Sequence, residues 1–217
     1  MASRRRDEAL DRERTEERRR QILDAAAEVF ARRGYQRART QEIAAVAGVA
    51  EGTIYNYFAS KRDLLLALMQ RMFEESTPGL LAQLEHKDAG RFLEGVIRDR
   101  YALLDRHRSV LLAIVPELLV DAELRDEYLR RVVGPLVRTL MPLVQRRFPD
   151  EQVRQFDPHV ALPAMMGSVF FAYIVNELPQ APLGPPVSRE RLVAELVRFV
   201  LHGIGRQVAS FPEEVQA

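Results

Sequence analysis

Apolar residues recur at spacings of three and four along nearly the whole chain, and this pattern restricts the fold to packed α-helices. Strand signals, which need alternating apolar and polar residues, are almost absent. Long helices are expected at about 89–106, 109–120, 122–147, 157–178 and 188–208. Proline residues inside these patterns are expected to kink or interrupt them; they are Pro116, Pro135, Pro142 and Pro163. The predicted fold class is all-α.

The composition is that of an ordinary globular protein of 217 residues, 47% hydrophobic and 29% charged. Cysteine is absent, which excludes disulfides, thiolate metal sites and thiol nucleophiles. The histidines His86, His107, His159 and His202 lack the spacing of metal ligands. No nucleophile elbow, phosphate-binding glycine loop or paired-carboxylate site is present. We therefore expect no metal, no cofactor and no enzymatic activity.

Neither a signal peptide nor a membrane span is expected. The first 20 residues contain many arginines, but no apolar run follows them. The longest uncharged and mostly apolar run, 160–175, is 16 residues long and contains Pro163 and Gly167. A membrane-spanning helix needs about 20 apolar residues. We therefore expect a protein of the cytoplasm.

Charge divides the chain into a basic front and a mildly acidic remainder. Residues 1–62 hold fourteen Lys or Arg against ten Asp or Glu, whereas the rest holds eighteen against twenty-one. A basic front indicates a polyanionic partner. Residues 1–15 lack apolar periodicity, so we expect a flexible charged arm that either follows a DNA backbone or stays solvated. Thr15 is then expected to cap the first helix.

The segment after the arm contains four helical patterns. The first has an apolar face of Ile22, Ala26, Val29 and Phe30, and Gly34 is expected to end it. The second is expected to begin at a Thr40 cap, to end at Gly48 and to turn Ile43, Ala44 and Ala47 inward. A further short helix over about 50–57 precedes one that starts at Ser60, where Asp63 is spaced as in a capping box.

Two short helices joined by a glycine turn, with a third packed behind them, match the helix-turn-helix arrangement, here at about 39–58. Val49 and Ile54 are expected to anchor the second helix, and Phe58 to fill the core. The remaining side chains are then available to a DNA groove; they are Glu51, Gly52, Thr53, Tyr55, Asn56 and Tyr57. Tyrosine hydroxyls suit phosphate oxygens, which accept many of the hydrogen bonds in protein–DNA interfaces.

The stretch TQEIAAVAGVAEGTIYNYFASKRDLL, residues 40–65, resembles the DNA-binding signature of the TetR family, the tetracycline-repressor-like transcriptional regulators. The resemblance extends back through ILDAAAEVFARRGYQRART and covers about residues 16–70. Beyond it, the chain resembles the family only in length and helicity. The resemblance implies a three-helix helix-turn-helix DNA-binding module at 16–76 and a helical ligand-binding and dimerisation domain at 77–217.

The resemblance also implies roles for single residues. Thr40, Tyr55, Tyr57 and Lys61 would contact phosphates, while Gly52, Thr53 and Asn56 would lie at or near bases. Two positions depart from the family pattern. Ala50 stands where serine is common, so the side-chain cap of the recognition helix is lost. Glu51 is acidic where the family often has a basic or polar residue; it either stabilises the helix dipole or accepts a hydrogen bond from a cytosine amino group.

The expected effector site is defined by apolar side chains of the body. The candidates for its lining are Phe92, Tyr101, Leu104, Ile114, Leu118, Tyr128, Met141, Met165, Met166, Phe170 and Tyr173. They either line a cavity or simply form core. Many Met and Phe with few internal charges favour a lipophilic effector, for which a fatty acyl chain or acyl-CoA is our hypothesis. Aromatic compounds or multiple drugs are the alternatives.

The last two helices, about 157–178 and 188–208, are more apolar than the core of one monomer requires. We expect them to form the four-helix bundle of a homodimer, as the resemblance also implies, and to match a palindromic operator in double-stranded DNA. The predicted function is a ligand-responsive transcriptional regulator, a repressor released by a small molecule. The alternatives are an effector-independent architectural DNA-binding protein and an all-α enzyme; the second requires catalytic polar residues that the sequence does not display.

Overall fold

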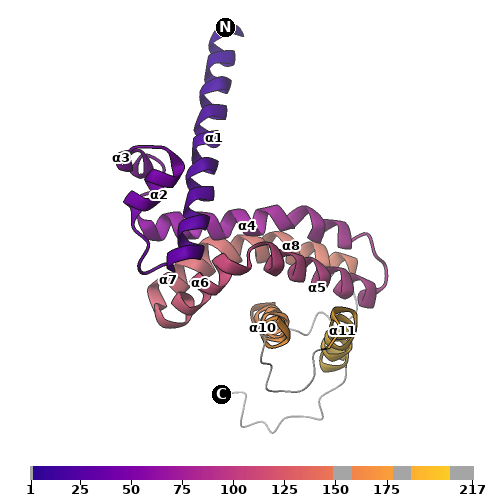
Figure 1. The fold of residues 1–217 in the computed structure, drawn as a ribbon. Helices are drawn as coiled ribbons and strands as arrows, with labels where there is room; N and C mark the ends of the chain where they lie inside the picture. Colours follow the sequence, from indigo (N-terminus) through magenta and orange to yellow (C-terminus); the bar gives the residue numbers. More distant parts are fainter. Residues whose placement is uncertain (1, 149–157, 178–186, 206–217) are drawn as a thin grey trace, which may run out of the picture. The chain divides into compact units, whose positions relative to one another are not determined.

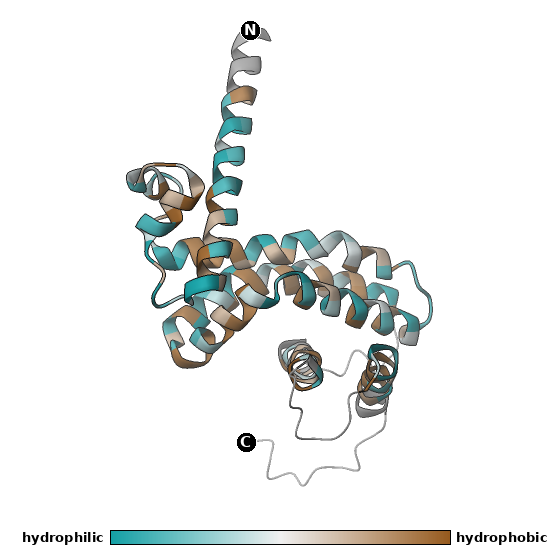
Figure 2. Ribbon diagram, in the orientation of Figure 1, coloured by the Kyte–Doolittle hydropathy of each residue, from teal (hydrophilic) through white to brown (hydrophobic). Residues whose placement is uncertain are grey.

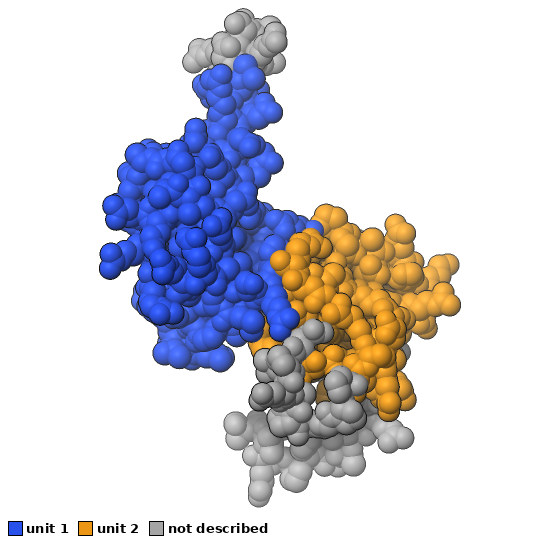
Figure 3. All heavy atoms as spheres, viewed as in Figure 1, with its two compact units in different colours: residues 1–75, 107–135 blue, residues 76–106, 136–217 orange. Residues whose placement is uncertain are grey.

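The computed structural model describes residues 2–148, 158–177 and 187–205, and these residues form helices without strands, as predicted (Figure 1). In chain order the elements are α1 (Ala2–Arg33), α2 (Thr40–Ala47), α3 (Glu51–Tyr55), α4 (Lys61–Gln83), α5 (Ala89–Arg106), α6 (Arg108–Val120), α7 (Ala122–Tyr128), the π-helical turn η1 (Leu129–Val133), α8 (Gly134–Arg147), α10 (Pro158–Glu177) and α11 (Arg189–Gly205). The chain divides into unit 1, residues 1–75 and 107–135, and unit 2, residues 76–106 and 136–217 (Figure 3).

The C-terminal half of α1 contributes one wall of the core of unit 1. Ile22, Ala26, Val29 and Phe30 are buried, which confirms the predicted apolar face. The same helix packs on α2 and on α6. Figure 2 shows the corresponding change along α1, from a hydrophilic first part to hydrophobic residues near its end.

The first part of α1 differs from the prediction of a flexible arm at residues 1–15. The structure continues α1 back to Ala2, and Thr15 lies inside the helix, where its hydroxyl donates to the carbonyl of Asp11 at 2.8 Å. Ion pairs three residues apart support a solvated helix here; they are Arg14 with Asp11 and Arg20 with Glu17. The expected helix start at Thr15 was wrong because it relied on apolar periodicity, which a helix held by its own charges does not need. The flexibility of residues 1–15 stays a prediction.

Two glycines with left-handed backbone end the first two helices. Gly34 has φ 74° and donates its N–H to the carbonyl of Phe30, and Gly48 has φ 64° and ψ 34° at the end of α2. The N–H of Val49 then donates to the carbonyl of Ala44, so the turn satisfies the last carbonyls of α2. These contacts fix the angle at which α3 leaves α2.

Helix α4 begins with a capping arrangement and then enters the core. The hydroxyl of Ser60 accepts from the N–H of Asp63 at 3.0 Å, and the Asp63 carboxylate accepts from the N–H of Ala59 at 3.1 Å. Every residue in 64–69 is buried. A helix that is apolar on all sides must be surrounded by other elements, so this part of α4 lies at the centre of unit 1.

The prediction of a single body at 77–217 differs from the structure in one respect. Residues 107–135, which form α6, α7 and η1, belong to unit 1, where α6 packs on α1. The predicted helix over 122–147 is also divided, because η1 separates α7 from α8. Pro135, the second residue of α8, has no N–H to donate, and the wider π-helical turn directly before it accommodates that loss.

Unit 2 contains α5 packed on α11 and α10, and these two helices also contact each other. Apolar side chains from all three helices are buried; examples are Val96, Ile97, Val169, Val193 and Val200. The Arg147 guanidinium at the end of α8 donates to the carbonyls of Leu84 and Glu85. The unit thus has an apolar interior with polar contacts at the helix ends.

Substituting Gly48 tests the turn between α2 and α3. A Cβ at this position meets no atom within 4 Å, so Gly48→Ala carries only the strain of a left-handed backbone, about 1–2 kcal/mol of unfolding free energy. Gly52→Ala is the matched control, because its Cβ is equally unobstructed and its φ is not positive. Urea unfolding should show a lower midpoint for Gly48→Ala alone; equal midpoints would contradict the role assigned to this turn.

Candidate DNA-binding surface

Helix α3 is fixed to unit 1 through two buried side chains and presents its other residues outward. Ile54 and Phe58 are buried, as predicted. Among the predicted groove residues, Glu51, Gly52, Tyr55 and Asn56 are exposed, whereas Thr53 and Tyr57 are half-buried. The N-cap residue Ala50 makes no side-chain hydrogen bond, in line with the expected loss of a cap.

Gly52 leaves the front of α3 open. A Cβ there would meet no atom within 4 Å, so another backbone can approach closely from this side. Tyr55, one turn later, has 51% of its surface exposed although it is aromatic. The helix therefore offers a bare backbone and a phenol on one accessible surface.

A hydrogen-bonded cluster joins α3 to the start of α2. The hydroxyl of Thr40 donates to the Glu51 carboxylate at 2.6 Å and lies 3.2 Å from the Tyr55 hydroxyl. Thr40 and Tyr55, two residues predicted to contact phosphate, are thus hydrogen-bonded to each other, and Glu51, the first residue of α3, accepts from Thr40. Neither of the two roles predicted for Glu51, dipole stabilisation or base contact, includes this arrangement.

Helix α1 contacts the helix-turn-helix through two polar side chains. The Arg19 guanidinium lies 5.2 Å from the centre of the Phe58 ring, a cation–π distance. The Gln21 amide donates to the carbonyl of Ala47 at 2.7 Å, at the end of α2. These contacts fasten the two short helices to the long one.

Lys61 lies in a different environment from the one predicted. Its ammonium donates to the carbonyls of Tyr35, Gln36 and Ala38 at 3.0–3.1 Å and lies 4.6 Å from the centre of the Tyr35 ring. An ammonium has three N–H donors, and all three are occupied here. The geometry gives Lys61 a structural role at the 34–39 turn; the phosphate contact stays a prediction. Burial lowers its pKa from the ordinary lysine value.

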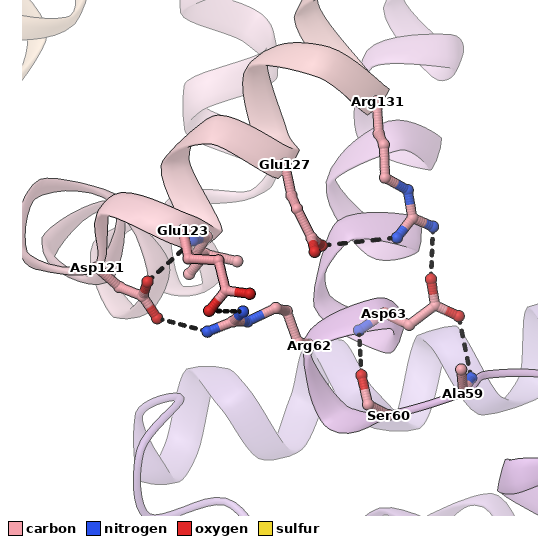
Figure 4. Close-up of polar contacts among 9 residues, drawn as sticks. Ala59, Ser60, Arg62, Asp63, Asp121, Glu123, Glu127 and Arg131 are labelled. Atoms are coloured by element: carbon pink, nitrogen blue, oxygen red, sulfur yellow. Dashed lines mark hydrogen bonds and ion pairs between the residues drawn. The ribbon is translucent and has the colours of Figure 1, made fainter.

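Arg62, the next residue, joins the start of α4 to the start of α7. Its guanidinium contacts the Asp121 carboxylate at 2.9 Å and the Glu123 carboxylate at 2.8 Å (Figure 4). Hydrogen bonding to Glu123 raises the pKa of Arg62. The Asp121 carboxylate also caps α7, accepting from the N–H of Leu124 at 2.9 Å.

The N–H of Leu124, with help from Arg62, lowers the pKa of Asp121. A lowered carboxyl pKa adds stability above the ordinary value of about 4, and this stability is lost as the pH falls through the folded-state pKa. The junction between α4 and α7 is therefore intact at neutral pH and weakens in acid.

A second ion pair lies beside the first. Arg131, in η1, contacts Asp63 at 2.5 Å and Glu127 at 3.8 Å (Figure 4). Asp63 is the capping residue of α4, so its carboxylate binds both the helix start and the π-helical turn. The first turn of α4, which directly follows the recognition segment, is in this way bonded to α7 and η1.

The predicted effector-lining residues do not lie in one unit. Ile114, Leu118 and Tyr128 belong to unit 1, and the other eight belong to unit 2. Within unit 2, Phe92, Tyr101, Leu104 and Tyr173 are buried, and Met141, Met165, Met166 and Phe170 are half-buried. The rings of Tyr101 and Tyr173 lie 5.5 Å apart and come from α5 and α10.

Sequence reasoning missed the charged side chains of unit 2. Asp105 accepts from the Tyr173 hydroxyl at 3.1 Å and from the Arg189 guanidinium at 2.6 Å. Arg100 is buried in the middle of α5. One signal was visible in the sequence: Arg100 interrupts the apolar stripe that includes Val96 and Leu104 at intervals of four residues.

Within the described ranges, His, Asp and Glu side chains form no group of three or more that could hold a metal ion. The same ranges include no helix whose length and hydropathy suit a membrane crossing.

Residues 22–68 match the model of the family described as bacterial regulatory proteins, tetR family. The fatty acid metabolism regulator protein of Bacillus subtilis (strain 168) is 38% identical over 99 residues. That alignment covers 45% of this chain and 50% of the regulator, so the chain spans about half the length of this relative.

Two solved structures resemble the chain over most of its length. The fatty acid degradation regulator FadR from Bacillus halodurans has a TM-score of 0.68 at 24% identity and covers 88% of this chain and 97% of its own. FadR from Bacillus subtilis, determined in complex with stearoyl-CoA, has a TM-score of 0.65 at 26% identity and covers 84% of this chain and 97% of its own.

Replacing Lys61 should affect stability more than DNA contact. Lys61→Met leaves three carbonyls without their donor, so we expect the free energy of unfolding to fall by about 1–3 kcal/mol. Urea unfolding measures this loss. The exposed Lys87 gives the matched control, Lys87→Met, which should unfold like the wild type.

The salt dependence of DNA binding separates the two roles of Lys61. A phosphate contact would lower the slope of log Kobs against log salt by about one per subunit when removed. We expect an unchanged slope for Lys61→Met. A reduced slope with unchanged stability would restore the predicted phosphate contact.

Removing the charge of Glu51 should strengthen DNA binding. Glu51→Gln keeps an acceptor for Thr40 but removes a carboxylate from the exposed end of α3. We expect roughly two- to fivefold tighter binding to any DNA at about 50 mM salt, and a smaller gain at higher salt because exposed charges are screened. Glu28→Gln, on the exposed side of α1, is the control. A loss of affinity confined to sites with one particular base pair would instead identify Glu51 as a base-reading residue.

Proposed function

Because the chain belongs to the tetR family of bacterial regulatory proteins, we propose that it is a ligand-responsive, DNA-binding transcriptional repressor of the cytoplasm, without enzymatic activity. The observation that carries this proposal is the accessible surface of α3, where Gly52, Tyr55 and Asn56 are exposed while Ile54 and Phe58 anchor the helix. Such a helix can enter a major groove without disturbing the core behind it.

The contacts with DNA follow from this surface. Gly52 allows the backbone of α3 to approach base edges, and Thr53 and Asn56 lie close enough in sequence to share that approach. The hydroxyls of Thr40, Tyr55 and Tyr57 suit phosphate oxygens. Lys61 is left out of this set because its donors are already occupied.

The effector we propose is a long-chain acyl-CoA. The support comes from the B. subtilis FadR structure, whose ligand is stearoyl-CoA, and from the apolar interior of unit 2. Buried Phe92, Leu104 and Tyr173 with half-buried Met165 and Met166 suit a flexible hydrocarbon chain, since methionine adapts to irregular shapes.

The acting form we propose is a homodimer through α10 and α11. An apolar stripe of small and large residues is exposed along α10 at intervals of three and four; it consists of Val160, Ala164, Gly167 and Phe171. Phe171 is 64% exposed, and Phe199 of α11 is 67% exposed. Packing these faces against a second copy would bury them and would set two α3 helices on a palindromic operator.

Regulation would act through the first turn of α4. Arg62 and Asp63 bond this turn to α7 and η1, and both α4 and the segment after η1 continue into unit 2. An acyl-CoA that binds the DNA-incompetent arrangement more tightly shifts the protein away from its operator. The free energy by which acyl-CoA weakens operator binding is set by the difference between its affinities for the two arrangements.

DNA binding with and without acyl-CoA tests the proposed function. We expect the chain to prefer the DNA upstream of its own gene, or a palindrome selected from random DNA, over scrambled DNA. A dimer that neutralises roughly 6–10 phosphates should lose about 10³–10⁵ in affinity between about 50 and 200 mM salt. Stearoyl-CoA should release the operator, whereas CoA alone should not.

Two variants serve as controls for this measurement. Tyr55→Ala should weaken operator binding without changing the oligomeric state. Phe171→Glu should yield a monomer in sedimentation velocity and lose operator binding with it. Binding that is indifferent to DNA sequence and to acyl-CoA would favour the architectural DNA-binding protein instead.

A further inference from the structure

Arg100 is a charged residue at a buried helix position whose neighbours on the same face are apolar. It lies on α5, with Val96 and Leu104 four residues away on either side and Ile97 and Leu103 three residues away. All four of these apolar side chains are buried. Only 5% of the Arg100 surface is exposed. Charged side chains are almost never this buried unless their hydrogen-bonding groups are matched.

The hydrogen bonding of Arg100 is incomplete. A guanidinium has five N–H donors. Its Nη2 donates to the carboxylate of Asp99, its neighbour in the chain, at 2.5 Å, but its buried Nε finds no hydrogen-bond acceptor. The Nε of Arg71, on α4, is likewise buried without a hydrogen-bond acceptor, but Arg71 has two ion-pair partners, the carboxylates of Asp24 and Glu75. Arg100 therefore has a single carboxylate partner for a guanidinium whose residue is only 5% exposed.

The ion pair with Asp99 does not explain, through stability alone, why Arg100 is buried in α5. Moving two charges out of water costs about as much as their attraction returns, and well-packed apolar residues often serve folding equally well. An unsatisfied buried donor adds a further cost. A ligand that places a hydrogen-bond acceptor at Nε would remove that cost, and it would bind more tightly for that reason.

The charge of the surroundings selects the kind of acceptor. Asp99 already neutralises Arg100, so an incoming carboxylate would leave a net negative charge in the interior of unit 2. An uncharged carbonyl oxygen accepts the Nε–H without that penalty. Long apolar molecules that end in such a group include acyl thioesters, whereas free fatty acids end in a carboxylate.

We propose that Arg100 recognises the thioester carbonyl of an acyl effector and so distinguishes acyl thioesters from free fatty acids. This inference rests on the proposed function, because it assigns the head-group contact of the same effector. The apolar neighbours of Arg100 on α5 then face the start of the hydrocarbon chain. The charge of CoA itself is not needed for the contact.

Direct binding measurements on the full chain test the assignment. The probes are stearoyl-CoA, S-stearoyl-N-acetylcysteamine, which carries the thioester without the nucleotide, and stearate, each below its micellar concentration. We expect the wild type to bind both thioesters at least about tenfold more tightly than stearate. In the double variant Asp99→Asn with Arg100→Met, thioester affinity should fall about 10- to 100-fold, to the level of stearate.

The double variant removes both charges together, so no carboxylate is left unpaired, and its thermal unfolding midpoint should be no lower than that of the wild type. Arg98→Met is the matched control, since Arg98 lies on the same helix but is exposed and paired with Glu94. It should retain the thioester preference. Operator binding without effector should be unchanged in both variants.

The outcomes separate this inference from the proposed function. If stearoyl-CoA releases the wild type from its operator but the double variant keeps the thioester preference, the role of Arg100 is wrong and the regulator stands. Equal binding of stearate and the thioesters by the wild type also overturns it. If the wild type binds no acyl thioester, both the inference and the proposed effector fail.

Discussion

Residues 64–69 of α4 are buried on every side of the helix, and unit 1 is arranged around that fact. A helix with no solvent-facing side has to be covered by other segments. Helices α1, α2 and α6 each contribute buried apolar side chains to the same unit. The recognition helix α3 needs only two buried side chains, Ile54 and Phe58, to join this assembly. The stability of the candidate DNA-binding surface therefore comes from elements that need not touch DNA.

The first turn of α4, in contrast to the buried residues 64–69, is polar and partly exposed. Arg62 and Asp63 are partly exposed, and their ion pairs with α7 and η1 are of the kind that contributes little net stability. Weak but specific contacts suit the junction that the proposed regulation would rearrange, because a modest difference in ligand affinity is enough to exchange them. A deeply buried apolar contact at this position would hold one arrangement too firmly.

The fold class and the helix-turn-helix were predictable because their signals are local. Gly34, Gly48 and the Ser60 cap determine where helices begin and end within a few residues of themselves. The carbonyl partners of Lys61 were not predicted, because they lie 23–26 residues earlier in the chain and no spacing rule reveals them. The placement of residues 107–135 in unit 1 and the π-helical turn likewise depend on packing between distant segments. The predicted DNA contacts and effector lining stay predictions.

Helix α3 has one further consequence, which concerns how such proteins diverge. Its anchoring residues, Ile54 and Phe58, and its outward residues, Glu51, Gly52 and Asn56, occupy separate positions of one short segment. Substitutions at the outward positions leave the core untouched, so duplicated copies of the gene could acquire new target sequences without first losing stability. The same separation makes these three positions a compact place to redesign target choice.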